Sequence, residues 1–119
     1  MAKTLKVTPD NRIQVVEVDF NRIEDIQREI GGYVERVCTR KLQEYFKSDV
    51  MMIVDEGGLS KGLPMNPTGS VFYDTVRHGN PIVGDFVLAV LDGENWKAPK
   101  EKQLEEWKAR LKKDFWLKE

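Results

Sequence analysis

Residues 54–66, VDEGGLSKGLPMN, hold the densest group of side chains in this sequence that could take part in chemistry. Asp55 and Glu56 are carboxylates, Lys61 is a cation, and glycines leave backbone amides uncovered. General acid–base catalysis needs two carboxylates that converge on one reacting group. Neighbouring residues on an extended strand point to opposite faces instead. The spacing therefore does not favour a catalytic pair, and we predict no catalytic residue in this stretch.

Binding of a small anion is the better interpretation of the same stretch. Cationic and amide side chains beside glycine-rich turns can hold a phosphate group. The predicted ligand-binding residues are Asp55, Glu56, Lys61, Asn66, Thr68 and Asp85. If the anion is a nucleotide, its base would stack on an aromatic ring. The candidates for this ring are Tyr33, Phe72 and Tyr73.

A small hydrolase or transferase that uses Asp55, Glu56 and His78 is the enzymatic alternative. His78 is the only histidine and Cys38 the only cysteine. A buried thiol at a strand position is a more common role for such a cysteine than a nucleophile paired with a histidine. One cysteine and one histidine do not complete a tetrahedral zinc site, and the sequence has no nucleotide-binding or nucleophile-elbow motif. We therefore expect that the protein binds neither a metal nor a cofactor. We also expect its role to be non-enzymatic.

The bulk composition predicts one ordinary globular domain over residues 1–119. The 19 basic and 20 acidic residues give a formal net charge of -1. This balance argues against general nucleic-acid binding, which needs a basic excess that releases counterions. A single cysteine excludes an internal disulfide. No signal peptide or membrane-spanning apolar run is visible. We therefore expect a cytoplasmic protein without membrane association.

The elements expected around the candidate site begin with a β-hairpin over residues 3–19 and a short helix over residues 21–30. Asn21 and Glu24 suggest a capping box at the start of this helix, and Gly31 and Gly32 suggest its end. Strands are expected at residues 33–39, 50–54 and 81–92, the second of them buried on both faces. Paired glycines at 57–58 suggest a second hairpin with a short returning edge strand. Asn66 before Pro67 is typical of a helix start.

The C-terminal residues 99–118 form the most strongly patterned helix. Its apolar stripe consists of Leu104, Trp107, Leu111 and Phe115. Trp116 lies off this stripe, and an exposed tryptophan can anchor a partner protein. Such a tryptophan-rich helix also suggests a homodimer. The whole pattern predicts an α+β fold with a mostly antiparallel sheet, a short capped helix after the first hairpin and a C-terminal amphipathic helix on one face.

Three separated motifs, EIGGYVERV at 29–37, VDEGGLSKGLPMN at 54–66 and PIVGDFVLAV at 81–90, carry a family resemblance. The chain resembles a small domain of unknown function found in bacteriophages, plasmids and bacterial mobile elements. The resemblance covers residues 5–90 and leaves the C-terminal helix outside the pattern. It implies an accessory protein that binds and inhibits a host protein or another host component, and it attaches no activity to any residue. The residues themselves suggest an alternative function, in which the protein sequesters a small anionic ligand such as a nucleotide.

Overall fold

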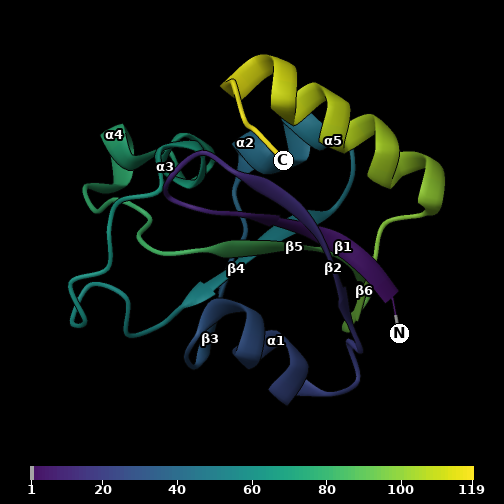
Figure 1. The fold of residues 1–119 in the computed structure, drawn as a ribbon, viewed down its shortest axis with the longest axis horizontal. Coiled ribbons are helices and arrows are strands. Elements are labelled where there is room, and N and C mark those ends of the chain that lie inside the picture. Colours follow the sequence, from purple (N-terminus) through teal and green to yellow (C-terminus); the bar gives the residue numbers. More distant parts are fainter. Residues whose placement is uncertain (1) are drawn as a thin grey trace.

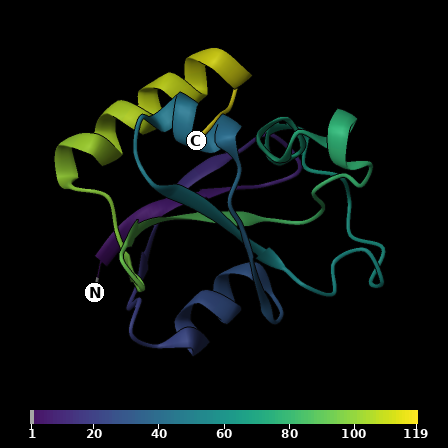
Figure 2. The same ribbon diagram turned by 180° about the vertical axis from the view of Figure 1, so that it is seen from behind.

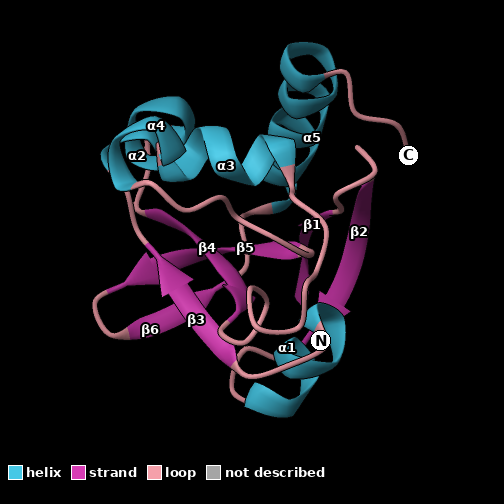
Figure 3. Cartoon of the chain, turned by 90° about the vertical axis from the view of Figure 1, so that its left-hand side faces the viewer, coloured by secondary structure: helices cyan, strands magenta, loops and turns pink. Residues whose placement is uncertain are grey.

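A six-stranded sheet separates two layers of helices in the computed structural model, which describes residues 2–119 (Figure 1). Helix α1 covers one face of the sheet, and α2, α3 and α5 cover the other. The view from behind (Figure 2) and the side view (Figure 3) show the same division. The elements in chain order are β1 (Ala2–Val7), β2 (Ile13–Val18), α1 (Ile23–Ile30), β3 (Val34–Val37), α2 (Arg40–Phe46), β4 (Val50–Asp55), α3 (Pro67–Tyr73), α4 (Thr75–His78), β5 (Phe86–Asp92), β6 (Asn95–Lys97) and α5 (Glu101–Phe115). The predicted α+β class is confirmed.

All the strand pairs of the sheet are antiparallel, in the order β2-β1-β5-β4-β3, with β6 beside β5. Strand β4 is buried along its whole length, as its continuous apolar run predicts. Successive side chains of a strand point to opposite faces. Val50, Met52 and Val54 therefore join the core under α2, α3 and α5, while Met51 and Ile53 join the core under α1. Strand β3 is an edge strand of the sheet.

Helix α5 packs on the sheet through the predicted stripe, in which Leu104, Trp107 and Leu111 are buried. After α5 the chain turns back to the loop between β1 and β2. There Ile13 N donates to Lys118 O at 2.8 Å, and Lys118 N donates to Asn11 O at 2.9 Å. Within residues 2–119, no helix is both long enough and apolar enough to cross a membrane.

Three local predictions are wrong, each for a physical reason. Asn21 does not cap α1, which begins at Ile23 without a side-chain cap. Residues 57–63 form consecutive turns rather than a returning strand, because Gly57 N and Gly58 N both donate back to Asp55. Cys38 is exposed, since Val37 takes the inward position at the end of β3 and the next side chain points outward.

Two other local predictions are confirmed. Gly31 ends α1 in the left-handed conformation, with φ of 81°, which glycine adopts without steric cost. Asn66 caps α3, accepting a hydrogen bond from Gly69 N, and Pro67 occupies the first turn. The polar segment after β3 forms α2.

Candidate functional site

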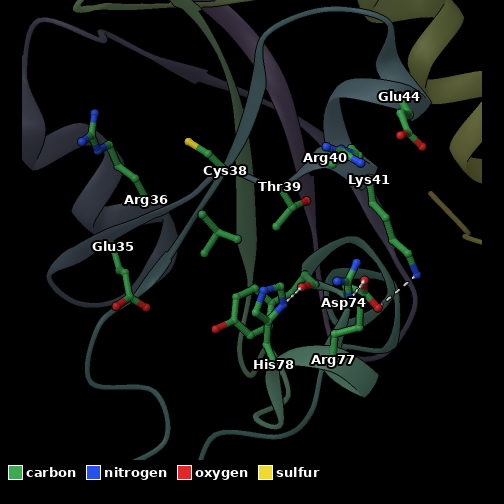
Figure 4. Close-up of a pocket in the computed structure, with 12 residues that line it drawn as sticks. Glu35, Arg36, Cys38, Thr39, Arg40, Lys41, Glu44, Asp74, Arg77 and His78 are labelled. Atoms are coloured by element: carbon green, nitrogen blue, oxygen red, sulfur yellow. Dashed lines mark hydrogen bonds and ion pairs between the residues drawn. The ribbon is translucent and has the colours of Figure 1, made fainter.

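A pocket of about 770 Å³ lies at the free edge of β3. We call it the charged pocket. One wall comes from β3, the segment after it and the start of α2, and the other comes from the junction of α3 and α4. The lining residues are Glu35, Arg36, Val37, Cys38, Thr39, Arg40, Lys41, Glu44, Tyr73, Asp74, Arg77 and His78. Figure 4 shows how these side chains surround the opening.

Thr39 fixes the two walls of the charged pocket relative to each other. Its hydroxyl accepts a hydrogen bond from Leu42 N at 3.2 Å and so caps α2. The same hydroxyl donates to Phe72 O, at the end of α3, at 2.6 Å. One small side chain therefore both starts the helix that carries Arg40 and ties it to the opposite wall.

The cations of the charged pocket fall into two classes. Lys41 Nζ lies 3.4 Å from Asp74 Oδ1, and Arg77 Nε lies 4.0 Å from Asp74 Oδ2. Arg36 and Arg40 have no ion-pair partner in the described part of the chain. Both guanidinium groups are thus without an internal ion pair, and guanidinium geometry suits phosphate and carboxylate groups. Figure 4 shows the Arg36 side chain directed away from His78, on the same side of the strand as the sulfur of Cys38.

Tyr73 and His78 form an aromatic pair beside these cations. Their ring centroids are 4.8 Å apart and the rings are inclined by 28°, which is a stacked arrangement. His78 Nδ1 lies 2.7 Å from the carbonyl oxygen of Tyr73, so the end of α4 is fixed to the end of α3. His78 is exposed, and its ring therefore offers a surface on which a further flat group can stack.

Cys38 and His78 line the same pocket without forming a nucleophile and base. No hydrogen bond joins them in residues 2–119, and the sulfur of Cys38 is directed away from His78 (Figure 4). A thiol nucleophile needs its base within hydrogen-bond reach. Within the same residues, no three histidine, cysteine or carboxylate side chains gather in a way that could hold a metal ion. The arrangement is suited to binding an anion.

Two of the six residues that the sequence assigns to a ligand site come together, in a separate pocket of about 300 Å³. Asp55 Oδ2 accepts from Lys61 Nζ at 2.6 Å, and Oδ1 accepts from Gly57 N at 2.8 Å. Lys61 also donates to Gly31 O at 3.2 Å. We call these residues the Asp55–Lys61 cluster. The carboxylate is almost fully buried, and its acceptors are engaged by the protein itself.

The other four residues of that predicted set lie outside the Asp55–Lys61 cluster. Glu56 is exposed, and Asp85 Oδ2 lies 3.5 Å from Lys6 Nζ. Asn66 and Thr68 are buried at the start of α3. The side-chain amide of Asn66 donates to Val7 O and Gly84 O at 3.1 and 3.0 Å. Its polar atoms are therefore used in holding three segments of the fold.

Sequence reasoning missed the charged pocket, although signals for it were present. Arg36, Arg40 and Lys41 stand within six positions of one another, in and directly after the strand expected at residues 33–39. Of the three aromatic residues considered for stacking, Tyr73 lines the charged pocket and Tyr33 lines the pocket of the Asp55–Lys61 cluster. Phe72 is buried in the core. His78, which the sequence suggests only as part of an enzymatic alternative, lines the same pocket as these cations.

Comparison with protein families gives one match. A family model described as "Domain of unknown function (DUF3846)" matches residues 2–112. This span includes both walls of the charged pocket, and it also includes most of α5, which the resemblance drawn from the three motifs left outside the family pattern. Comparison with curated proteins gives no match, and neither does comparison with solved structures.

Proposed function

This chain belongs to the DUF3846 family of domains of unknown function, and we propose that its charged pocket binds a small phosphate-bearing ligand, with nucleotides as the favoured class. The observation that carries the proposal is the pair of arginines, Arg36 and Arg40, that line the pocket without an internal acidic partner. Charge-assisted hydrogen bonds from arginine to phosphate are about twice as strong as neutral ones.

The size and charge of the pocket support this ligand class. Small-molecule sites commonly occupy roughly 300–1,000 Å³, and the charged pocket has about 770 Å³. Its lining contains four basic and three acidic side chains. Asp74 is already engaged by Lys41 and Arg77, so the charged lining groups without an ion pair within residues 2–119 are the two arginines and, beside them, Glu35 and Glu44. A ligand with a compact, multiply charged head would fit this arrangement better than a neutral one.

The stacked pair of Tyr73 and His78 favours a nucleotide over a simple inorganic anion. A base can stack on the exposed ring of His78 while its phosphate extends toward Arg40 on the opposite wall. Base–aromatic stacking contributes about 1–3 kcal/mol per base. The phosphate supplies the charge that the cations recognise, and the base supplies a flat surface for the aromatic pair.

Thermal unfolding with and without ligand tests this proposal. We expect a nucleoside diphosphate near millimolar concentration to raise the Tm by several degrees, because a ligand at about 100 times its Kd adds roughly 2.7 kcal/mol of stability. Inorganic pyrophosphate should give a smaller shift, because it lacks the base. A panel of nucleotides and pyrophosphate that leaves the Tm unchanged would contradict the proposal.

The resemblance to domains of phages, plasmids and mobile elements suggests where such binding would be useful. We propose an accessory protein of a mobile element that sequesters a nucleotide of its host. Sequestration needs affinity for the ligand and no catalysis.

Trp116 supports binding of a host protein as a second candidate function. Its side chain is 84% exposed, although the next residue, Leu117, is buried and Lys118 is bound through its backbone to the β1–β2 loop. The tryptophan is therefore held in place while it faces solvent. Fixed aromatic side chains of this kind are common anchors of protein interfaces.

Capture of partners from a bacterial lysate tests this second candidate. Trp116→Ala should reduce recovery of a specific partner at least about tenfold, the scale of a typical interface hot spot. Tyr33→Ala is a matched control, because Tyr33 is another exposed aromatic residue, 75% exposed, on a different part of the surface. Equal recovery by the wild type and Trp116→Ala, or equal loss in both variants, would argue against an anchoring role.

A further inference from the structure

We propose that His78 contacts the ligand of the charged pocket and that its protonation strengthens binding of the ligand's phosphate. The inference rests on the proposed function and deepens it, since it assigns one contact and one regulating variable to that site. It starts from the hydrogen bond between the imidazole ring and the backbone, which fixes where the ring carries its hydrogen.

The neutral imidazole of His78 has one tautomer compatible with its surroundings. Nδ1 lies 2.7 Å from the carbonyl oxygen of Tyr73, and a carbonyl oxygen only accepts hydrogen bonds. Nδ1 therefore carries the hydrogen and donates it. The other ring nitrogen, Nε2, then carries a lone pair in the neutral ring and gains a hydrogen only on protonation.

Protonation changes what His78 offers to a phosphate. The lone pair on Nε2 repels a phosphate oxygen, whereas a protonated Nε2 donates a charge-assisted hydrogen bond to it. The Tyr73 ring stacks on one face of the imidazole, and the bond to the Tyr73 carbonyl holds its Nδ1 edge. Because His78 is exposed, the Nε2 edge remains accessible to a ligand.

The charged and titratable groups around His78 come from both walls of the pocket. On its own wall they are Tyr73, Asp74 and Arg77. On the facing wall they are Glu35, Arg36 and Cys38 from the β3 segment, and Arg40, Lys41 and Glu44 from α2. Arginine, lysine and carboxylate side chains ordinarily keep their charge between about pH 5.5 and pH 8, and imidazole is the side chain that ordinarily gains a charge there.

The direction of the effect follows from linkage. A bound anion favours protonated His78, so by reciprocity protonation favours the bound anion. Affinity for the anion should therefore rise as the pH falls. A coupling of one pK unit corresponds to a tenfold change in affinity. We expect roughly five- to tenfold tighter binding at about pH 5.5 than at about pH 8.

Isothermal titration calorimetry with a nucleoside 3′,5′-cyclic phosphate tests the inference on the full chain. A phosphodiester keeps a single negative charge across this pH interval, so the ligand itself does not titrate. His78→Asn is the informative variant, because its amide can still donate to the Tyr73 carbonyl while Nε2 is removed. We expect this variant to bind more weakly than the wild type at every pH, because it also loses the ring on which the base stacks, and to show no gain in affinity at lower pH.

Three outcomes separate this inference from the proposed function. Binding by the wild type that does not depend on pH overturns the role of His78 and leaves the proposed function intact. A His78→Asn variant that keeps the wild-type pH dependence overturns it as well. Absence of binding at every pH, with nucleoside diphosphates and pyrophosphate also inactive, overturns the proposed function and this inference with it.

Discussion

Asn66→Ala should lower the free energy of unfolding by about 3–5 kcal/mol, one of the largest losses that a single polar substitution in this chain can produce. The Asn66 side chain is fully buried. It donates to Val7 O and Gly84 O and accepts from Gly69 N at 3.0 Å. The substitution leaves three buried backbone groups without partners, and each such group costs about 1–3 kcal/mol. Urea unfolding followed by circular dichroism measures the loss.

Asn21→Ala is the matched control for this prediction. Asn21 is exposed and its side chain makes no hydrogen bond in the described part of the chain. Its replacement should change stability by less than about 0.5 kcal/mol, as is usual at exposed positions. Asn66→Ser should fall between the two, since its hydroxyl can still cap α3 but is too short to reach both carbonyl oxygens. Similar stabilities for the two alanine variants would contradict the structural role of Asn66.

Gly32→Ala should destabilise the protein by about 2–3 kcal/mol through the Asp55–Lys61 cluster. A β-carbon at Gly32 would stand 2.6 Å from both Cγ and Oδ2 of Asp55 and closer still to Oδ1. The carboxylate would have to move, and it would lose its bonds to Lys61 and Gly57. A buried carboxylate separated from its cation is costly. Because Lys61 is half-exposed, the expected loss of stability is smaller than the loss from breaking a fully buried ion pair.

Gly57→Ala separates this steric effect from a general intolerance to alanine in the same loops. A β-carbon at Gly57 would lie 3.5 Å from Asp55 Oδ1 and 3.5 Å from Lys61 Cε, which is ordinary contact. We expect a change within about 0.5 kcal/mol for this control. Thermal or urea unfolding of both variants gives the comparison. If Gly32→Ala is as stable as the wild type, the close approach does not constrain the fold as we infer.

Much of the fold could be predicted because its signals are local. The apolar run at residues 50–54 indicated a strand buried on both faces, and alternate residues of β4 do fill separate cores. Asn66 with Pro67 indicated a helix start, and α3 begins there. The turns at residues 57–63 could not be predicted from their glycines. Their path depends on the Asp55 side chain, which accepts from both Gly57 N and Lys61 Nζ.

The charged pocket was harder to predict because its walls meet only through tertiary packing. Thr39 and Phe72 are 33 residues apart, and their hydrogen bond joins the two walls. No periodicity indicates that contact, so Arg36 and Arg40 could not be assigned to one pocket with His78 from sequence. Asn66 and Lys61 are predicted ligand-binding residues because they are polar and lie near glycines. In the structure, both side chains donate hydrogen bonds to backbone carbonyl groups of other segments. The residue types indicate which side chains could bind a ligand. Tertiary packing determines which of them are free of internal hydrogen bonds and ion pairs.

Binding of a nucleoside diphosphate by wild type, Arg36→Gln/Arg40→Gln and Arg22→Gln, measured by isothermal titration calorimetry, tests the central claim most directly. Arg22 is an exposed arginine outside the charged pocket, so it controls for loss of positive charge alone. We predict wild-type affinity for Arg22→Gln. We predict affinity roughly 100-fold lower for the double variant, since each charged hydrogen bond contributes about 1.5 kcal/mol or more. Equal affinity in all three proteins, or no binding by the wild type, would contradict an anion site at this pocket.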